Sequence, residues 1–78
     1  MVFADEKDDL QIGASIPGMV SKVQVKEGDK VEKNQVVAIV EAMKMETSVV
    51  AKVDGTIEKV YIKEGQSVKA GELLIQMA

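Results

Sequence analysis

The sequence predicts an all-β domain, a flattened β-barrel or sandwich of about eight short strands in two halves related by a pseudo-two-fold axis. Valine and isoleucine dominate from Leu10 onward, and β-branched side chains prefer strands. Apolar and polar residues alternate with the period of two that half-buried strands require, and no stretch sustains helical spacing over two turns. A stretch of the second half also repeats a stretch of the first, which indicates two similar β-units.

The individual strands follow from this alternation and from the glycine, aspartate and asparagine residues that interrupt it. The longer strands are expected at residues 19–25, 35–41, 47–51, 56–62 and 72–77. Shorter pieces near Ile12, Val31 and Val68 are expected to pair as well. Residues 1–9 are mostly polar and charged, so we interpret them as a linker or frayed N-terminus that precedes one domain at 10–78.

The internal repeat has an offset of 37 residues, which aligns 18–39 with 55–76 and gives seven identities in 22 aligned pairs. Both copies contain the turn sequence Lys-Glu-Gly, at 26–28 and 63–65, where glycine suits a turn with positive φ. Each half is too small to bury its apolar face alone, so the halves are expected to pack against each other.

The repeat also predicts where the segment after residue 41 lies. The strand that leads into this segment corresponds to the strand that leads to the C-terminus. Under an approximate two-fold axis, equivalent points of the two halves lie at opposite ends. The segment at 42–45 is therefore expected as far from the C-terminal end as the domain allows.

Composition excludes several classes of function. The chain has no histidine and no cysteine, which removes the residues on which Ser-His-Asp, Cys-His and His-metal catalysis depend. The net charge is −3, all ten basic residues are lysines interleaved with acids, and only one Phe and one Tyr are present, so nucleic-acid binding is not expected. No apolar run approaches the roughly 18 residues of a membrane span. We expect a soluble, cytoplasmic domain without a membrane partner.

The segment 41–47, EAMKMET, joins two strongly strand-forming stretches and is expected to form a β-hairpin with a tight turn near Met43 and Lys44. Such turns favour Asn-Gly or Asp-Gly because both central residues need positive φ, and this chain has neither. A local rule broken at an exposed tip indicates function. A lysine amine is ordinarily protonated at neutral pH, so Lys44 is a poor nucleophile by itself. Its long stem suits a group attached by another enzyme.

This segment resembles the biotinylation motif of biotin-dependent carboxylases, whose AMKM signature carries biotin on the lysine at the position of Lys44. The resemblance runs from about Gln11 to the end and includes Pro17-Gly18 and the closing GELL at 71–74. It implies a fold of the biotinyl/lipoyl type with biotin attached covalently to Lys44. The flanking recognition positions that it implies are Glu41, Ala42, Met43, Met45 and Glu46. Many family members have glycine where this chain has Asn34, which also tolerates left-handed backbone.

The resemblance implies a carrier that is not catalytic alone. Biotin protein ligase would attach the cofactor, a biotin carboxylase domain would carboxylate it, and a carboxyltransferase domain would take the carboxyl group from it. The sequences at 12–15 and 45–47 are similar to the C-terminal domain of bacterial pyruvate carboxylase, which makes oxaloacetate from pyruvate. The chain has no room for the thumb insertion of the bacterial acetyl-CoA carboxylase carrier. Acyl-CoA carboxylases and sodium-pumping decarboxylases also lack that insertion, so they stay open as parents.

Two other classes of function share this fold. One is a lipoyl carrier of 2-oxoacid dehydrogenases, whose lysine typically lies between Asp and Ala rather than between two methionines. The other is an unmodified β-sandwich adaptor, which generally lacks an exposed lysine at the tip. Among the flanking residues, Met43 and Met45 either contact the partner enzymes or cover the hairpin, whereas Glu41 and Glu46 either steer the ligase or keep the tip soluble.

Overall fold

The computed structural model describes residue 4 and residues 8–78, and every regular element in that part of the chain is a β-strand. Of the expected linker at 1–9, residues 1–3 and 5–7 lie outside the described residues. The strands are β1 Gln11–Gly13, β2 Gly18–Val23, β3 Lys30–Val31, β4 Val36–Ala42, β5 Met45–Val50, β6 Gly55–Val60, β7 Ser67–Val68 and β8 Leu73–Met77. The predicted all-β class is confirmed, and each expected strand is present.

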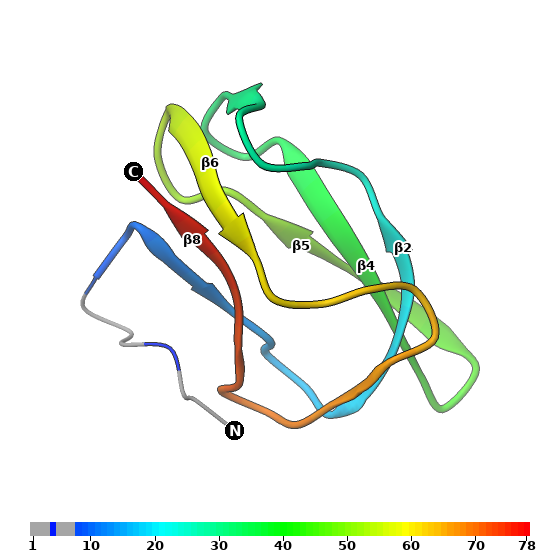
Figure 1. Cartoon of the computed structure of the whole chain (residues 1–78). Coiled ribbons are helices and arrows are strands. Elements are labelled where there is room, and N and C mark those ends of the chain that lie inside the picture. The colour runs from blue at the N-terminus through cyan, green and yellow to red at the C-terminus, as the bar shows by residue number, and fades with distance from the viewer. Residues whose placement is uncertain (1–3, 5–7) are drawn as a thin grey trace.

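The strands form two four-stranded antiparallel sheets, with the orders β1-β8-β6-β3 and β5-β4-β2-β7 (Figure 1). The first half of the chain contributes β1 and β3 to one sheet and β2 and β4 to the other. Adding the 37-residue offset turns β2 into β6 and β3 into β7, with the same bounds in each pair. Each sheet is therefore built from both halves of the chain.

The backbone hydrogen bonds obey the same two-fold relation. Gly28 N–H donates to the Ile57 carbonyl at 2.8 Å, and Gly65 N–H donates to the Val20 carbonyl at 2.8 Å. The offset converts the first bond into the second with donor and acceptor exchanged between the halves. The same exchange relates the bond from Asn34 N–H to the Ala51 carbonyl and the bond from Gly71 N–H to the Ala14 carbonyl. The pseudo-two-fold arrangement predicted from the repeat is confirmed.

The core lies between the two sheets and consists of aliphatic side chains. Its largest fully buried members are Ile12, Ile57, Leu74, Ile75, Met77, Val20, Val37 and Val40. Burying one such side chain stabilises a fold by about 1.5–3 kcal/mol, so these contacts supply the main stabilising contribution. Within the described residues, no polar or charged side chain is buried.

The expected strands at 19–25 and 56–62 are both too long at their C-terminal ends, because β2 ends at Val23 and β6 at Val60. Val25 and Ile62 are buried, which preserves the alternating pattern in the sequence, but neither belongs to a strand. Beyond these ends the backbone leaves one sheet to join the other. The last ladder-like contacts are the bonds from Gln24 N–H to the Val37 carbonyl and from Tyr61 N–H to the Leu74 carbonyl.

The β4–β5 hairpin and the C-terminal end lie at opposite ends of the molecule. Figure 1 shows the C-terminus beyond β8 at the upper left, and the tip of the hairpin projects at the lower right. This is the placement expected from the repeat. The hairpin tip is therefore well separated from the C-terminal end of β8.

Candidate functional site

The tip of the hairpin is a two-residue turn made by Met43 and Lys44. Ala42 at the end of β4 lies opposite Met45 at the start of β5, so only these two residues connect the strands. Met43 has φ 51° and Lys44 has φ 67°, both in the left-handed region. The predicted tight turn is confirmed. Left-handed backbone costs a non-glycine residue roughly 1–2 kcal/mol, so the sequence accepts strain at this point.

The side chains of the turn are held out in solvent. Met43 is 95% exposed and Met45 70% exposed, and Lys44 is exposed between them. Two large apolar side chains this exposed are unusual side by side in so small a domain. They form a contact surface around the lysine amine. The tip thus presents a primary amine flanked by two flexible thioethers.

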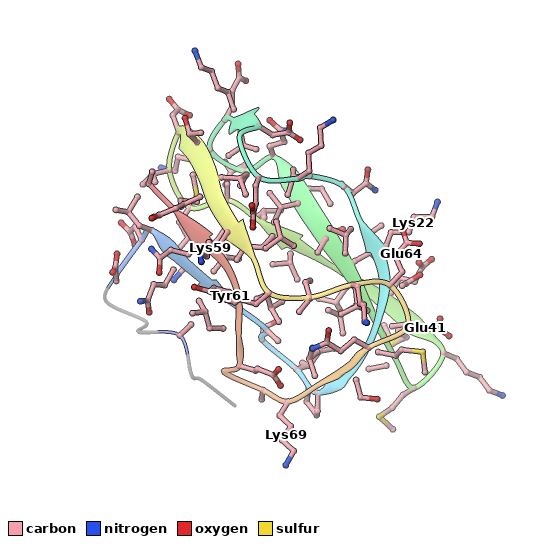
Figure 2. All side chains as sticks on the ribbon, in the orientation of Figure 1. Lys22, Glu41, Lys59, Tyr61, Glu64 and Lys69 are labelled. Atoms are coloured by element: carbon pink, nitrogen blue, oxygen red, sulfur yellow. The ribbon has the colours of Figure 1, made fainter. Side chains whose placement is uncertain are left out.

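Two glutamates lie at the base of the tip. Glu41 of β4 is directly opposite Glu46 of β5, and both are exposed. Figure 2 shows Glu41 at the side of the molecule where the hairpin projects. Like charges at directly opposed positions destabilise a sheet, and only Ser21 Oγ, at 3.5 Å from Glu46 Oε2, is a side-chain donor to the pair among the described residues. Two exposed carboxylates in this position are compatible both with steering of a ligase and with keeping the tip soluble.

A hollow of about 370 Å³ lies beside the tip. Its lining consists of Ile16, Pro17, Ala42, Met43, Met45 and Thr47. Sequence reasoning singled out three of these as site residues but did not assign Ile16, Pro17 or Thr47 to a site. The only signal for them was their position in, or next to, segments that resemble the carboxylase family. We name this the tip hollow.

Gly18 supports the hairpin from below. A Cβ atom at this position would lie 2.5 Å from the Glu41 carbonyl oxygen, 2.9 Å from Val40 Cγ1 and 3.1 Å from Ala42 Cβ. The start of β2 therefore lies directly against the last residues of β4. This close approach requires a residue without a side chain, and it fixes the end of β4 from which the turn projects.

The strain at Met43 leads to a test of stability. Replacing Met43 with asparagine should raise the free energy of unfolding by about 0.5–1 kcal/mol, because asparagine adopts left-handed backbone more readily and the exposed methionine loses no packing. Urea unfolding followed by circular dichroism measures the change. Met45→Asn is the matched control, because Met45 lies in a strand, where asparagine is disfavoured. An unchanged or lowered stability for Met43→Asn would contradict strain at the turn.

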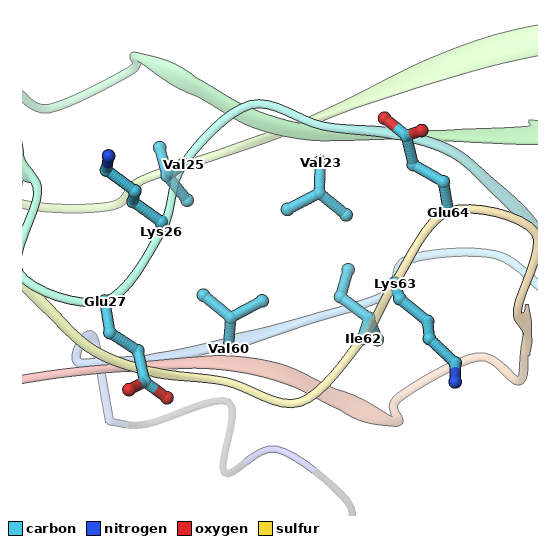
Figure 3. Close-up of a pocket in the computed structure, with 8 residues that line it drawn as sticks. All are labelled: Val23, Val25, Lys26, Glu27, Val60, Ile62, Lys63 and Glu64. Atoms are coloured by element: carbon cyan, nitrogen blue, oxygen red, sulfur yellow. The ribbon is translucent and has the colours of Figure 1, made fainter.

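A larger hollow, of about 540 Å³, lies on the pseudo-two-fold axis. Figure 3 shows Val23, Val25, Val60 and Ile62 around its centre and two Lys-Glu pairs, at 26–27 and 63–64, around its rim. Every lining residue has its repeat partner in the lining, and none belongs to the hairpin. Lys26 and Lys63 thus lie in symmetric turns, away from the motif.

In the described part of the chain, no three His, Cys, Asp or Glu side chains gather in a way that could hold a metal ion. Over the same residues, no helix is long and apolar enough to cross a membrane.

The chain matches a known protein family. The sequence pattern of the biotin/lipoyl family, described as biotin-requiring enzyme, matches residues 11–77. This range contains both sheets and the whole hairpin.

Known proteins that resemble the chain include carboxylases and a lipoyl domain. A pyruvate carboxylase from Staphylococcus aureus is 43% identical over 74 residues, which cover 95% of this chain and 6% of that enzyme. The urea carboxylase of Kluyveromyces lactis matches 100% of this chain and 7% of its own, with 32% identity and a TM-score of 0.84. The lipoyl domain of the 2-oxoglutarate dehydrogenase complex from Azotobacter vinelandii covers 86% of this chain and 95% of that domain, with 27% identity and a TM-score of 0.70.

Proposed function

Because this chain belongs to the biotin-requiring enzyme family, we propose that Lys44 is the residue that carries its covalent biotin. The chain is a biotin carrier domain, a part of carboxylases that is not catalytic alone. One observation supports the choice of Lys44 above all others. It is the lysine in the two-residue turn at the tip of the β4–β5 hairpin, between two exposed methionines.

The residues at the tip fit attachment of biotin. The cofactor joins a protein through an amide, which needs a primary amine that another enzyme can reach. Lys44 supplies such an amine on a flexible stem, and the rigid two-residue turn holds the stem away from the sheet surfaces. We assign deprotonation of the amine and activation of the biotin carboxyl group to the ligase.

The domain contributes presentation and transport to the reaction. Bound biotin supplies a ureido nitrogen that takes up and releases a carboxyl group, and the chemistry takes place in partner sites. The lysine stem and the biotin chain together reach on the order of 15 Å, about half of the longest extent of the domain, 31 Å. We infer that a side arm of this length is short for linking two separate active sites, and we expect the whole domain to move between them on a linker. Tethering keeps the local concentration at roughly millimolar.

We further propose that the parent enzyme is a pyruvate carboxylase, in which this domain meets a biotin carboxylase site and a carboxyltransferase site. The similarity to pyruvate carboxylase from S. aureus over nearly the whole chain supports this substrate. The similarity to a urea carboxylase keeps other acceptors open, because the chain spans only 6–7% of either protein. Biotin protein ligase as the attaching enzyme and a cytoplasmic location belong to the same proposal.

A lipoyl carrier is the second candidate, favoured by the similarity of the fold to a lipoyl domain. The residues beside Lys44 argue against it. Lipoyl lysines typically lie between aspartate and alanine, whereas Lys44 lies between Met43 and Met45. The fold is common to both carriers, so the flanking side chains decide between them.

The direct test is the intact mass of the chain after incubation with a biotin protein ligase, ATP and biotin, followed by peptide mapping. We expect a gain of one biotin minus one water, located in the peptide that contains Lys44 and in none of the peptides with the other nine lysines. A parallel reaction with a lipoate ligase and lipoate should give no gain. Modification at a different lysine, or by lipoate alone, would overturn the assignment.

A further inference from the structure

We propose that the tip hollow is a resting site for the biotin carried by Lys44, a proposal that rests on the proposed attachment at that residue. In this state the bicyclic ring and its aliphatic chain lie against Ala42, Met45 and Ile16 instead of extending into water. The tip then has two states, one with biotin folded onto the hairpin and one with biotin extended toward a partner site.

The tip hollow is an uncovered continuation of the core-facing surface of the hairpin. Val40 is buried in the core, and Ala42 lies two residues further along the same strand, so both side chains point to the same side of the sheet. Thr47 is opposite Val40, and Met45 is opposite Ala42, which places them on that side too. The hairpin thus carries its inner face beyond the core.

Only one short segment of the described chain reaches this overhanging face. Ile16 and Pro17, in the connection between β1 and β2, form the other wall of the tip hollow, and Ile16 is itself only partly buried. Met45 remains 70% exposed although its side chain is on the core-facing side. Apolar surface left open in this way favours an apolar occupant.

The chemistry of the lining matches biotin. None of the six lining side chains is charged, and the hydroxyl of Thr47 is the single polar side-chain group among them. Aliphatic and thioether walls suit the sulfur-containing ring and the valeryl chain, while the hydroxyl suits a carbonyl of the amide or ureido group. A volume of about 370 Å³ lies within the range of small-molecule sites.

Position and charge favour the attached biotin over other occupants. Met43 and Met45 are the chain neighbours of Lys44 and both line the tip hollow, so a tether that reaches on the order of 15 Å easily folds back onto it. A free lysine ammonium would lose hydration in an apolar hollow and stays in water. Amide formation removes that charge. Biotinylation therefore gives residue 44 an uncharged side chain that fits the apolar tip hollow, whereas the charged, unmodified lysine does not.

The test uses methyl NMR of the full 78-residue chain, labelled at methionine and isoleucine methyl groups, before and after biotinylation. Intact mass is measured first, so that failure of attachment is recognised separately. We expect shift changes and nuclear Overhauser contacts from the biotin ring to the methyl groups of Met45 and Ile16. The Met19 methyl group is the internal control, because Met19 is 51% exposed but pairs with Glu41, on the outer face of the sheet.

A matched pair of variants places one new carboxylate on either face of β5. Thr47→Glu puts the charge in the tip hollow and should abolish the contacts, whereas Ser48→Glu puts it on the outer face and should keep them. If the ligase does not modify Thr47→Glu, Ile16→Lys replaces it with the same expectation. Biotin resonances identical to those of free biotinyl-lysine, or contacts to Met19 instead, would overturn the resting site. A chain that gains no mass would overturn the attachment at Lys44 and the resting site together.

Discussion

Lys44→Arg should lower biotin incorporation by at least about a hundredfold and leave the fold unchanged. Arginine keeps the positive charge and the long stem, and it adopts φ 67° no less readily than lysine, so the turn persists. Its guanidinium group is not an amine that a ligase can acylate. Intact mass after the ligase reaction measures the loss, and the thermal unfolding midpoint, expected within about 1 °C of the parent chain, confirms the fold.

The matched control for this change is Lys33→Arg. Lys33 is exposed and precedes Asn34, which also has left-handed backbone with φ 72°, so the variant makes the same chemical change beside a turn in the first half. It should incorporate biotin fully. If incorporation survives in Lys44→Arg and is lost in Lys33→Arg, biotin is attached to Lys33, and the assignment to Lys44 is wrong.

Gly18→Ala should be the most destabilising single methyl insertion near the hairpin, with a loss of about 2–3 kcal/mol in the free energy of unfolding. The new methyl group would meet the Glu41 carbonyl oxygen at 2.5 Å, and a backbone atom in a paired strand cannot move aside without breaking the pairing. For a domain of this size such a loss lowers the unfolding midpoint by roughly 4–8 °C per kcal/mol. Thermal unfolding by circular dichroism measures it.

The repeat supplies the control for Gly18→Ala. Gly55 is the equivalent glycine of the second half, but a Cβ atom there would meet only Met77 Cε, at 2.9 Å, among close neighbours. The end of a methionine side chain can rotate away, so Gly55→Ala should cost less than about 1 kcal/mol. Equal losses for the two variants would show that the close approach of β2 to β4 is not what requires glycine at position 18. We also expect Gly18→Ala to slow biotinylation, because it displaces the strand from which the turn projects.

Local patterns in the sequence are sufficient to predict the strands and the turn at the tip of the hairpin. Alternation predicts all eight strands, and the strongly strand-forming stretches on either side predict the turn at Met43 and Lys44, where the structure has two left-handed residues. The absence of Asn-Gly at this turn indicates a functional tip. The 37-residue repeat predicted the two-fold relation because matched residues occupy matched turns. Each of these features depends on residues close together in the chain or on a pattern that recurs along it.

Features that depend on contacts between distant segments were not predicted. The alternation predicts ends of β2 and β6 that are two residues too late, since Val25 and Ile62 keep the pattern while the backbone crosses between sheets. The tip hollow went unrecognised because one of its walls, Ile16 and Pro17, comes from a connection far from the hairpin in sequence. The requirement for glycine at position 18 is likewise visible only once β2 lies against β4.

The strand order has a consequence for biosynthesis. β8 is translated after the other seven strands described here, yet it occupies an inner position between β1 and β6. Until β8 leaves the ribosome, β1 has no partner strand and β6 can pair only with β3, so no complete layer covers the apolar side of the other sheet. Folding of this domain is therefore expected after translation of Leu73–Met77 rather than progressively. A chain that lacks β8 is expected to present no stable hairpin to a ligase, so attachment of biotin at Lys44 depends on a strand that is distant from Lys44 in the sequence.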